Sequence, residues 1–174
     1  MGRSFTIHKG KKSQVENFMH ARARMLDELK SAQHRLEEVE EIDSVMFVND
    51  SSATSVMATL DSIRCISDPL VWILCATPYD RDFILLSKIV RHKVKAIIVC
   101  GFEAQDIKST LSSGVDNFIV VEDLEEAVLE AKGIAQVGDV VLFSPSAPVG
   151  RSYNDINERG EDFKEKVSLL RGRL

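Results

Sequence analysis

The sequence predicts an α/β fold: a Rossmann-like, mainly parallel sheet of five or six strands with helices on both faces, plus an N-terminal helix. Three observations favour it. Short runs between residues 45 and 145 are apolar at consecutive positions, as in strands buried on both faces. Helical stretches of about 10–15 residues separate these runs, which is typical of parallel strands joined by crossover helices. The chain has 174 residues, which suits one domain with a single core.

The strand candidates differ from the helix candidates in their apolar spacing. Strands are expected at 45–49, 70–76, 94–101, 117–122 and 139–145. Helices are expected at 54–66, 82–91, 103–112 and 124–135. An amphipathic helix over 155–171 closes the chain, and its apolar side consists of Ile156, Phe163, Val167 and Leu170.

The N-terminal part of the chain has a different character. Residues 13–32 carry apolar side chains at three-, four- and seven-residue steps, which predicts one amphipathic helix within an extension over 1–32. The charged stretch 33–44 is either an edge strand or a linker. We therefore expect the main domain to span 33–174.

Composition excludes several classes of protein. The net charge of -5 argues against binding to nucleic acid and to an anionic membrane. No apolar run approaches the roughly 18–20 residues that span a bilayer, and the N-terminus lacks the apolar region of a signal peptide. The three cysteines form no CxxC pair and the four histidines are scattered, so no metal site is indicated. We expect a cytoplasmic protein with buried, reduced thiols.

Polar residues follow the first strand candidate, where a parallel α/β sheet binds its ligands. Neither GxGxxG nor the P-loop pattern occurs in the sequence. The stretch 49–55, NDSSATS, offers hydroxyls and Asp50 at a helix start, where backbone N–H groups are unpaired. It is either a ligand site or an ordinary N-cap. The neighbouring pair His34–Arg35 is more typical of a solvated face than of a site.

Two stretches together resemble one family. Residues 34–55, HRLEEVEEIDSVMFVNDSSATS, resemble the entry to the C-terminal domain of the Mur ligases, which has the pattern H-R-x-E-x-V, a strand, and N-D-S-K-A-T-N. Residues 138–167 resemble the pattern G-D-x-V-L-L-S-P-A-x-A-S-x-D-x-F-x-x-F-x-x-R-G-x-x-F. With the strand–helix rhythm between them, the resemblance covers roughly 33–171 and is greatest to the members that add D-glutamate.

The resemblance implies a domain that has lost part of its site. In the family, a UDP-binding domain and a central ATPase domain with a P-loop carry the acyl-phosphate chemistry, and the sequence contains no P-loop. Four positions that hold D-glutamate in the family have changed: two lysines, a serine and a phenylalanine are replaced by Ser52, Tyr79, Val149 and Ile156 respectively. Each lost ionic partner costs about 2–5 kcal/mol.

Other positions match the family. Arg35 matches the arginine that reaches the ATP phosphates and Asp50 the aspartate near the ATP ribose, which makes ATP a candidate cofactor. Asn49 and Ser51 are also retained in the first motif. For the remaining matches we favour maintenance of the fold over ligand binding; these are Thr54, Ser144, Pro145, Arg159, Gly160 and Phe163.

These features lead to a main hypothesis and two alternatives. The main hypothesis is a stand-alone homologue of the Mur ligase C-terminal domain, a pseudoenzyme without ligase activity that binds a nucleotide or a protein, or self-associates through the helix at 13–32. The first alternative is a subunit of a split ATP-dependent amino-acid ligase of peptidoglycan precursor synthesis, completed by a partner with the ATPase and UDP-binding domains. The second is a fragment of a split gene.

Overall fold

The computed structural model describes residues 33–75, 82–101, 104–150 and 152–173. The extension 1–32 lies outside the described residues, and so do the helix and the self-association predicted for it. Tyr79 also lies outside them.

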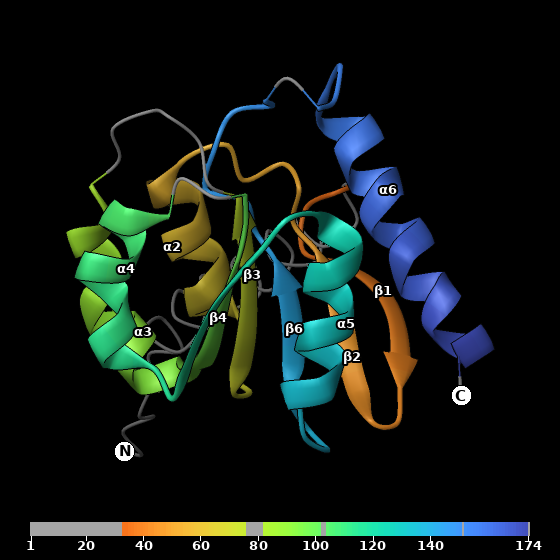
Figure 1. Ribbon diagram of the computed structural model, residues 1–174, viewed down its shortest axis with the longest axis horizontal. Coiled ribbons are helices and arrows are strands. Elements are labelled where there is room, and N and C mark those ends of the chain that lie inside the picture. Colours follow the sequence, from red (N-terminus) through yellow and green to blue (C-terminus); the bar gives the residue numbers. More distant parts are fainter. Residues whose placement is uncertain (1–32, 76–81, 102–103, 151, 174) are drawn as a thin grey trace, which may run out of the picture.

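The centre of the domain is one six-stranded sheet (Figure 1). From edge to edge its strands are β1 (Glu37–Ile42), β2 (Val45–Asn49), β6 (Val140–Phe143), β3 (Leu70–Cys75), β4 (Val94–Cys100) and β5 (Asn117–Val121). All neighbours pair in parallel except β1, which is antiparallel to β2. The predicted mainly parallel sheet is confirmed, and of the two alternatives left for 33–44 the edge strand is observed.

Helices cover both faces of the sheet, as predicted (Figure 1). One face carries α2 (Val56–Cys65), the 3₁₀ turn η1 (Phe83–Leu86), α3 (Ser87–Lys93), α4 (Gln105–Leu111) and the 3₁₀ turn η2 (Ser112–Gly114). The other face carries α5 (Leu124–Ile134) and α6 (Ile156–Leu169), which continues into the 3₁₀ turn η3 (Leu170–Arg173). Among the helices in the described part of the chain, none is long and apolar enough to cross a bilayer.

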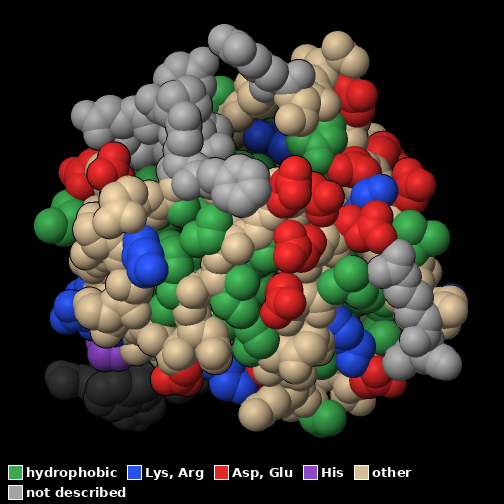
Figure 2. Space-filling view, viewed as in Figure 1, with side chains coloured by type: hydrophobic (Ala, Val, Ile, Leu, Met, Phe, Trp, Pro, Cys, Tyr) green, Lys and Arg blue, Asp and Glu red, His purple; other side chains and the backbone are tan. Residues whose placement is uncertain are grey.

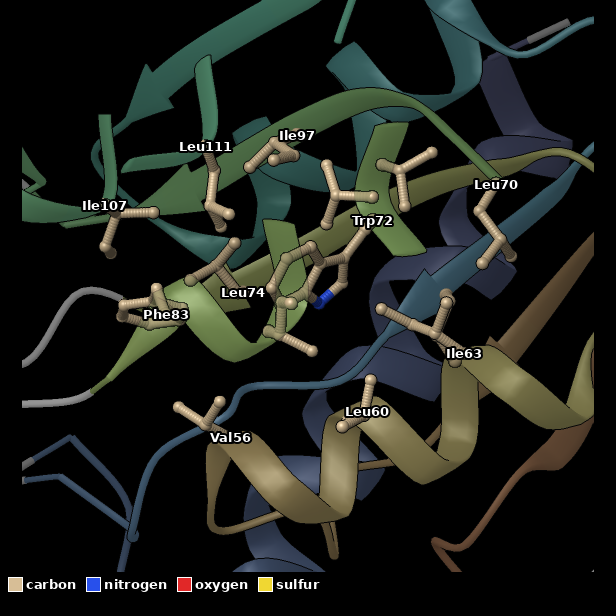
Figure 3. Close-up of a cluster of buried hydrophobic side chains, with 14 of the residues drawn as sticks. Val56, Leu60, Ile63, Leu70, Trp72, Leu74, Phe83, Ile97, Ile107 and Leu111 are labelled. Atoms are coloured by element: carbon tan, nitrogen blue, oxygen red, sulfur yellow. The ribbon is translucent and has the colours of Figure 1, made fainter. Parts of the chain in front are cut away.

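The strand β3 shows why the central strands are continuously apolar. Its residues alternate between the two faces, so Trp72 packs into the core beneath α2, and Val71 and Ile73 pack into the core beneath α5 and α6. Figure 3 shows Trp72 surrounded by apolar side chains from α2, η1 and the neighbouring strand β4. On the opposite face the rings of Phe143 and Phe163 stack with centroids 4.9 Å apart, which fixes α6 against β6.

Oxygen side chains mark where the longer helices begin. Ser55 is the N-cap of α2 and accepts a hydrogen bond from the Ala58 amide at 3.2 Å. Asp123 and Asp155 cap α5 and α6 in the same way. The hydroxyl-rich stretch 49–55 therefore does contain an ordinary N-cap, and it is Ser55 rather than Asp50.

Candidate functional site

Asp50 lies directly after β2, at the carboxyl end of the sheet, and is only 1% exposed. The Leu36 amide donates to Asp50 Oδ1 at 3.3 Å, and the Ser144 hydroxyl donates to Oδ2 at 2.7 Å. The hydroxyl of Ser62, from α2, forms a third hydrogen bond with this carboxylate. Asp50, which follows β2, thus joins the residue before β1, the helix α2 and the residue after β6.

A buried chain of hydroxyls continues from Asp50. Ser144 Oγ lies 2.8 Å from Thr59 Oγ1, and the Ser146 hydroxyl donates to the same Thr59 oxygen at 2.7 Å. The indole N–H of Trp72 donates to the Ser144 carbonyl at 2.8 Å. Because a buried hydroxyl without a partner costs about 1–3 kcal/mol, this network holds the turn after β6 in place.

Burial changes the ionisation of Asp50. It raises the pKa of this carboxyl from 3.8 to about 6, and the hydrogen bonds from Ser62, Ser144 and Leu36 and the charge of Arg35 oppose the rise only in part. At neutral pH the carboxyl is therefore ionised and accepts hydrogen bonds. Below about pH 6 it takes up a proton and becomes a donor as well.

Arg35 is exposed and lies between two residues with unusual backbone conformations. His34 and Leu36 have φ angles of 62° and 46°, in the left-handed region that non-glycine residues rarely adopt. This arrangement buries the side chains on either side and leaves the guanidinium of Arg35 in solvent. The solvated face expected for the His34–Arg35 pair is wrong for His34, which is completely buried and lies 2.9 Å from Asn49 Nδ2.

A cleft of about 330 Å³ opens beside Asp50. We call it the Asp50 cleft and define it by Arg35, Leu36, Asp50, Ser52, Asp61 and Ser62, which line it. It therefore combines a cation, an ionised acceptor and hydroxyl groups, the kinds of group that meet the phosphates and sugar of a nucleotide.

Further retained residues form a tight lock between the turn after β2 and α6. Asn49 Nδ2 donates to Glu37 Oε2 at 3.1 Å, and the side-chain oxygen Oδ1 of Asn49 accepts from the Ser51 amide at 3.1 Å. Arg159, from α6, donates to the Ser51 carbonyl at 2.6 Å. A Cβ atom on Gly160 would lie 2.1 Å from His34 Nδ1, so only glycine fits there. These contacts are all within the protein, and they favour a scaffold role for these residues.

The structure brings three of the changed positions close to the turn after β2. The Ser51 hydroxyl donates to the Ile156 carbonyl at 3.1 Å, and Arg159 donates to the carbonyls of both Ser51 and Pro148, the residues before Ser52 and Val149. Ser52 is half-buried and lines the Asp50 cleft, and Val149 and Ile156 are half-buried on and after the loop that follows β6. Of the other retained residues, Thr54 is exposed, while Pro145 is buried and its carbonyl accepts from the Cys75 amide at 3.3 Å. Ser52, Val149 and Ile156 therefore lie beside the same turn, while Tyr79 lies outside the described residues.

A second hollow, of about 280 Å³, lies at the carboxyl ends of β3 and β4. We call it the cysteine pocket and define it by Cys75, Cys100, Asp123, Phe143, Tyr153 and Arg159, which line it. The Tyr153 hydroxyl donates to Asp162 at 2.6 Å, and burial together with this bond raises the pKa of Tyr153. Within the described residues, no three His, Cys, Asp or Glu side chains are arranged to hold a metal ion.

Sequence reasoning missed the contribution of α2 to the Asp50 cleft. The missed residues are Ser62, which lines the cleft, and Thr59, which bonds Ser144 in the buried chain of hydroxyls, although Ser55, Thr59 and Ser62 follow one another at four- and three-residue steps. That spacing places polar side chains on one side of the helix. A polar stripe on a helix with an otherwise apolar inner face was the signal available.

A mainly parallel sheet with helices on both faces and a polar cleft at the carboxyl ends of its strands defines a Rossmann-like α/β domain. The family described as Mur ligase, glutamate ligase domain, matches residues 34–147. The chain belongs to the Mur ligase family, and within it to the C-terminal domain.

Curated relatives agree with this assignment. The chain is 35% identical over 151 residues to a UDP-N-acetylmuramoylalanine–D-glutamate ligase from Pseudothermotoga lettingae, a match that covers 86% of this chain and 35% of the relative. It is 40% identical over 141 residues to the ligase of the same name from Alkaliphilus metalliredigens, covering 79% and 30% respectively. The chain thus spans about a third of the length of the curated relatives it matches.

Solved structures share the fold. A MurF ligase from Thermotoga maritima in complex with ADP superposes with a TM-score of 0.52 at 15% identity, over 86% of this chain and 37% of that one. A UDP-N-acetylmuramoyl-L-alanyl-D-glutamate–2,6-diaminopimelate ligase superposes with a TM-score of 0.54 at 17% identity, over 91% and 36%. At this identity the likeness concerns the fold alone.

Proposed function

We propose that the domain over 33–174 binds a nucleotide in the Asp50 cleft and does not form peptide bonds by itself. The observation that carries the proposal is the composition of this cleft: an ionised, buried carboxylate and an exposed guanidinium line the same hollow of about 330 Å³. The site of action would be the cytoplasm, where ATP is available.

The hydrogen-bonding capacity of Asp50 supports a sugar contact. An ionised carboxylate accepts about four hydrogen bonds. Leu36, Ser144 and Ser62 supply three donors, so one acceptor direction is left for a hydroxyl of the ligand. A ribose hydroxyl has the right chemistry for this direction.

Arg35 supports a phosphate contact. Its guanidinium is exposed on the lining of the cleft, and it is held there by the strained backbone at His34 and Leu36. Left-handed conformations of non-glycine residues are unfavourable and cluster at functional sites. The planar guanidinium can bind a phosphate through two parallel hydrogen bonds.

The second half of the proposal, the lack of ligation, depends on the family resemblance. Ser52 lines the same cleft in place of the family's lysine and is neutral. Val149 and Ile156 offer no polar side-chain group to an anionic amino acid. An anionic acceptor amino acid beside the bound nucleotide would therefore lack the cationic partners that the family provides for it.

Calorimetry with ATP, ADP and a UDP-sugar tests nucleotide binding. We expect ATP to bind and Arg35→Ala to weaken it about tenfold, because one charge-assisted contact contributes about 1.5 kcal/mol. Arg91→Ala is the matched control, since Arg91 is an exposed arginine that lines a different cleft. Equal weakening by both variants, or no binding of any of the three ligands, would refute the proposal.

A ligation assay tests the other half. The purified full chain is mixed with ATP, D-glutamate and UDP-N-acetylmuramoyl-L-alanine, and release of phosphate and of the ligated product is followed. We expect neither. Product formation by this chain alone would overturn the claim.

A second candidate is a ligase that this domain completes. Membership of the Mur ligase family favours it, because the matched domain makes up about a third of each of the two ligases compared above. Co-purification with a P-loop protein, and ATP turnover only in the mixture, would support this candidate over the first. The changed positions count against D-glutamate as its acceptor but leave another amino acid open.

A further inference from the structure

Two cysteines lie side by side at the carboxyl end of the sheet, away from the Asp50 cleft. Cys75 is the last residue of β3 and Cys100 the last residue of β4, and their Cα atoms are direct partners across these parallel strands. Both side chains pack against the core beneath α5 and α6, so they lie on the same face of the sheet. Both are half-buried and line the cysteine pocket.

This placement suits a disulfide. Neighbouring strands lie about 4.8 Å apart, which falls inside the range of about 4.4–6.8 Å between the Cα atoms of disulfide-bonded cysteines. The two thiols are already hydrogen-bonded to each other. Both are thiols rather than a disulfide in the structure.

The surroundings of the two sulfur atoms differ. Arg159 lines the same pocket, is 1% exposed, and has an Nε–H without a hydrogen-bond partner in the structure. Its guanidinium interacts electrostatically with Cys75, and a neighbouring cation favours a thiolate. The hydrogen bond that the Cys100 thiol donates to Cys75, together with burial and the charge of Asp123, instead raises the pKa of Cys100. Cys75 is therefore the better nucleophile, and Cys100 is the resolving thiol that reacts with the oxidised Cys75.

We propose that Cys75 and Cys100 form a reversible dithiol–disulfide pair that a small neutral hydroperoxide oxidises. With hydrogen peroxide, the Cys75 thiolate attacks one oxygen, the O–O bond breaks, and the leaving hydroxide takes up the proton that the Cys75 thiol released, which gives a sulfenic acid and water. The Cys100 sulfur then attacks the Cys75 sulfur, the S–O bond breaks, and a second water leaves with the proton of Cys100. With hydrogen peroxide, two thiols and one peroxide give one disulfide and two waters.

Electrostatics explains the choice of a neutral oxidant. Acidic side chains gather over α5 and along α6 on the face shown in Figure 2, and the acids Glu122 and Asp123 line the pocket itself. An anionic oxidant is repelled by these groups, whereas hydrogen peroxide carries no charge and is small against a hollow of about 280 Å³. The oxidised pocket would lose both S–H groups and have its two strand ends cross-linked.

The experiment treats the full chain with hydrogen peroxide and then alkylates the remaining thiols. It compares the wild type with Cys75→Ser, Cys100→Ser and Cys65→Ser. Cys65 is the matched control because it is an exposed cysteine at the end of α2, outside the cysteine pocket. Intact mass, and peptide mapping without reductant, report which sulfur atoms have reacted.

We expect the disulfide to remove the mass of two hydrogen atoms from both the wild type and Cys65→Ser, with one added alkyl group on Cys65 in the wild type alone. Both proteins should yield one peptide cross-link between Cys75 and Cys100 and recover these two thiols with dithiothreitol. Cys75→Ser and Cys100→Ser should give no internal cross-link, and in Cys100→Ser a sulfenic-acid probe should label Cys75. Faster oxidation of Cys65 than of the pair, or a wild type that forms only cross-links between chains, would overturn the proposal. The wild-type peptide map decides the question even if a variant fails to fold.

Discussion

Replacing Gly160 by alanine tests the lock between α6 and the turn after β2. The new Cβ atom would lie 2.1 Å from Nδ1 and 2.7 Å from Cγ of His34, and 2.6 Å from the Ser51 hydroxyl. Real Cβ contacts of this length do not occur, so a neighbour must shift. His34 is completely buried and bonded to Asn49, which leaves its ring no open space to enter.

The expected loss follows from three terms. Overpacking in a close-packed interior costs about 1–3 kcal/mol, and breaking the buried contact between His34 and Asn49 costs about 1–3 kcal/mol more. Alanine returns about 1 kcal/mol through its greater helix propensity. We therefore expect Gly160→Ala to lower the free energy of unfolding by about 3 kcal/mol.

Urea unfolding of the wild type, Gly160→Ala and Gly133→Ala measures this effect. Gly133 is also helical, in α5, but a Cβ atom there would meet nothing within 4 Å. Gly133→Ala should therefore be neutral or should stabilise by up to about 1 kcal/mol. If Gly160→Ala unfolds at the same urea concentration as Gly133→Ala, the close packing of α6 against His34 is wrong.

Two further variants test the turn itself. Burial raises the pKa of Asp50 from 3.8 to about 6, so the folded protein holds this proton more tightly than the unfolded chain, and its stabilising effect is lost as the pH rises from about 4 to about 6. The shift corresponds to a change of about 3 kcal/mol in the free energy of unfolding, and Asp50→Asn should remove that part of its pH dependence. If the free energies of unfolding of the two proteins, measured with urea, change with pH in parallel, this expectation is wrong. Ser55→Ala removes the N-cap of α2 and should cost about 1 kcal/mol, while Thr54→Ala at the exposed neighbouring position should cost almost nothing. An equal loss in thermal unfolding would exclude the cap.

The sheet could be predicted because its signal is local. Central strands such as β3 are covered on both faces, so each of their residues must be apolar, and the run is visible in the sequence. The edge strand β1 is covered less completely and carries four glutamates, which is why 33–44 left two alternatives open. The residues of β1 gain their partners only when β2 lies alongside.

The site could be predicted only in part because its contacts are distant in sequence. Asp50 and Ser144 are 94 positions apart, and Asn49 and Gly160 are 111 apart. Spacing along the chain does not reveal such pairs, and the resemblance identified them only as matches to a motif. The expectation that the three thiols are buried was wrong, since Cys65 is exposed and Cys75 and Cys100 are half-buried.

The retained motif positions differ among themselves in burial, and this decides which of them can report on function. Asn49, Asp50, Ser144 and Arg159 are almost completely buried and bonded within the protein, so folding alone is a sufficient reason for keeping them. Arg35 is different: it is exposed, and the backbone on either side of it adopts a conformation that folding would not favour. Loss of Asp50 or Arg159 would weaken binding through loss of structure, whichever ligand is used. Arg35 is therefore the side chain whose removal separates a working nucleotide site from an inherited scaffold.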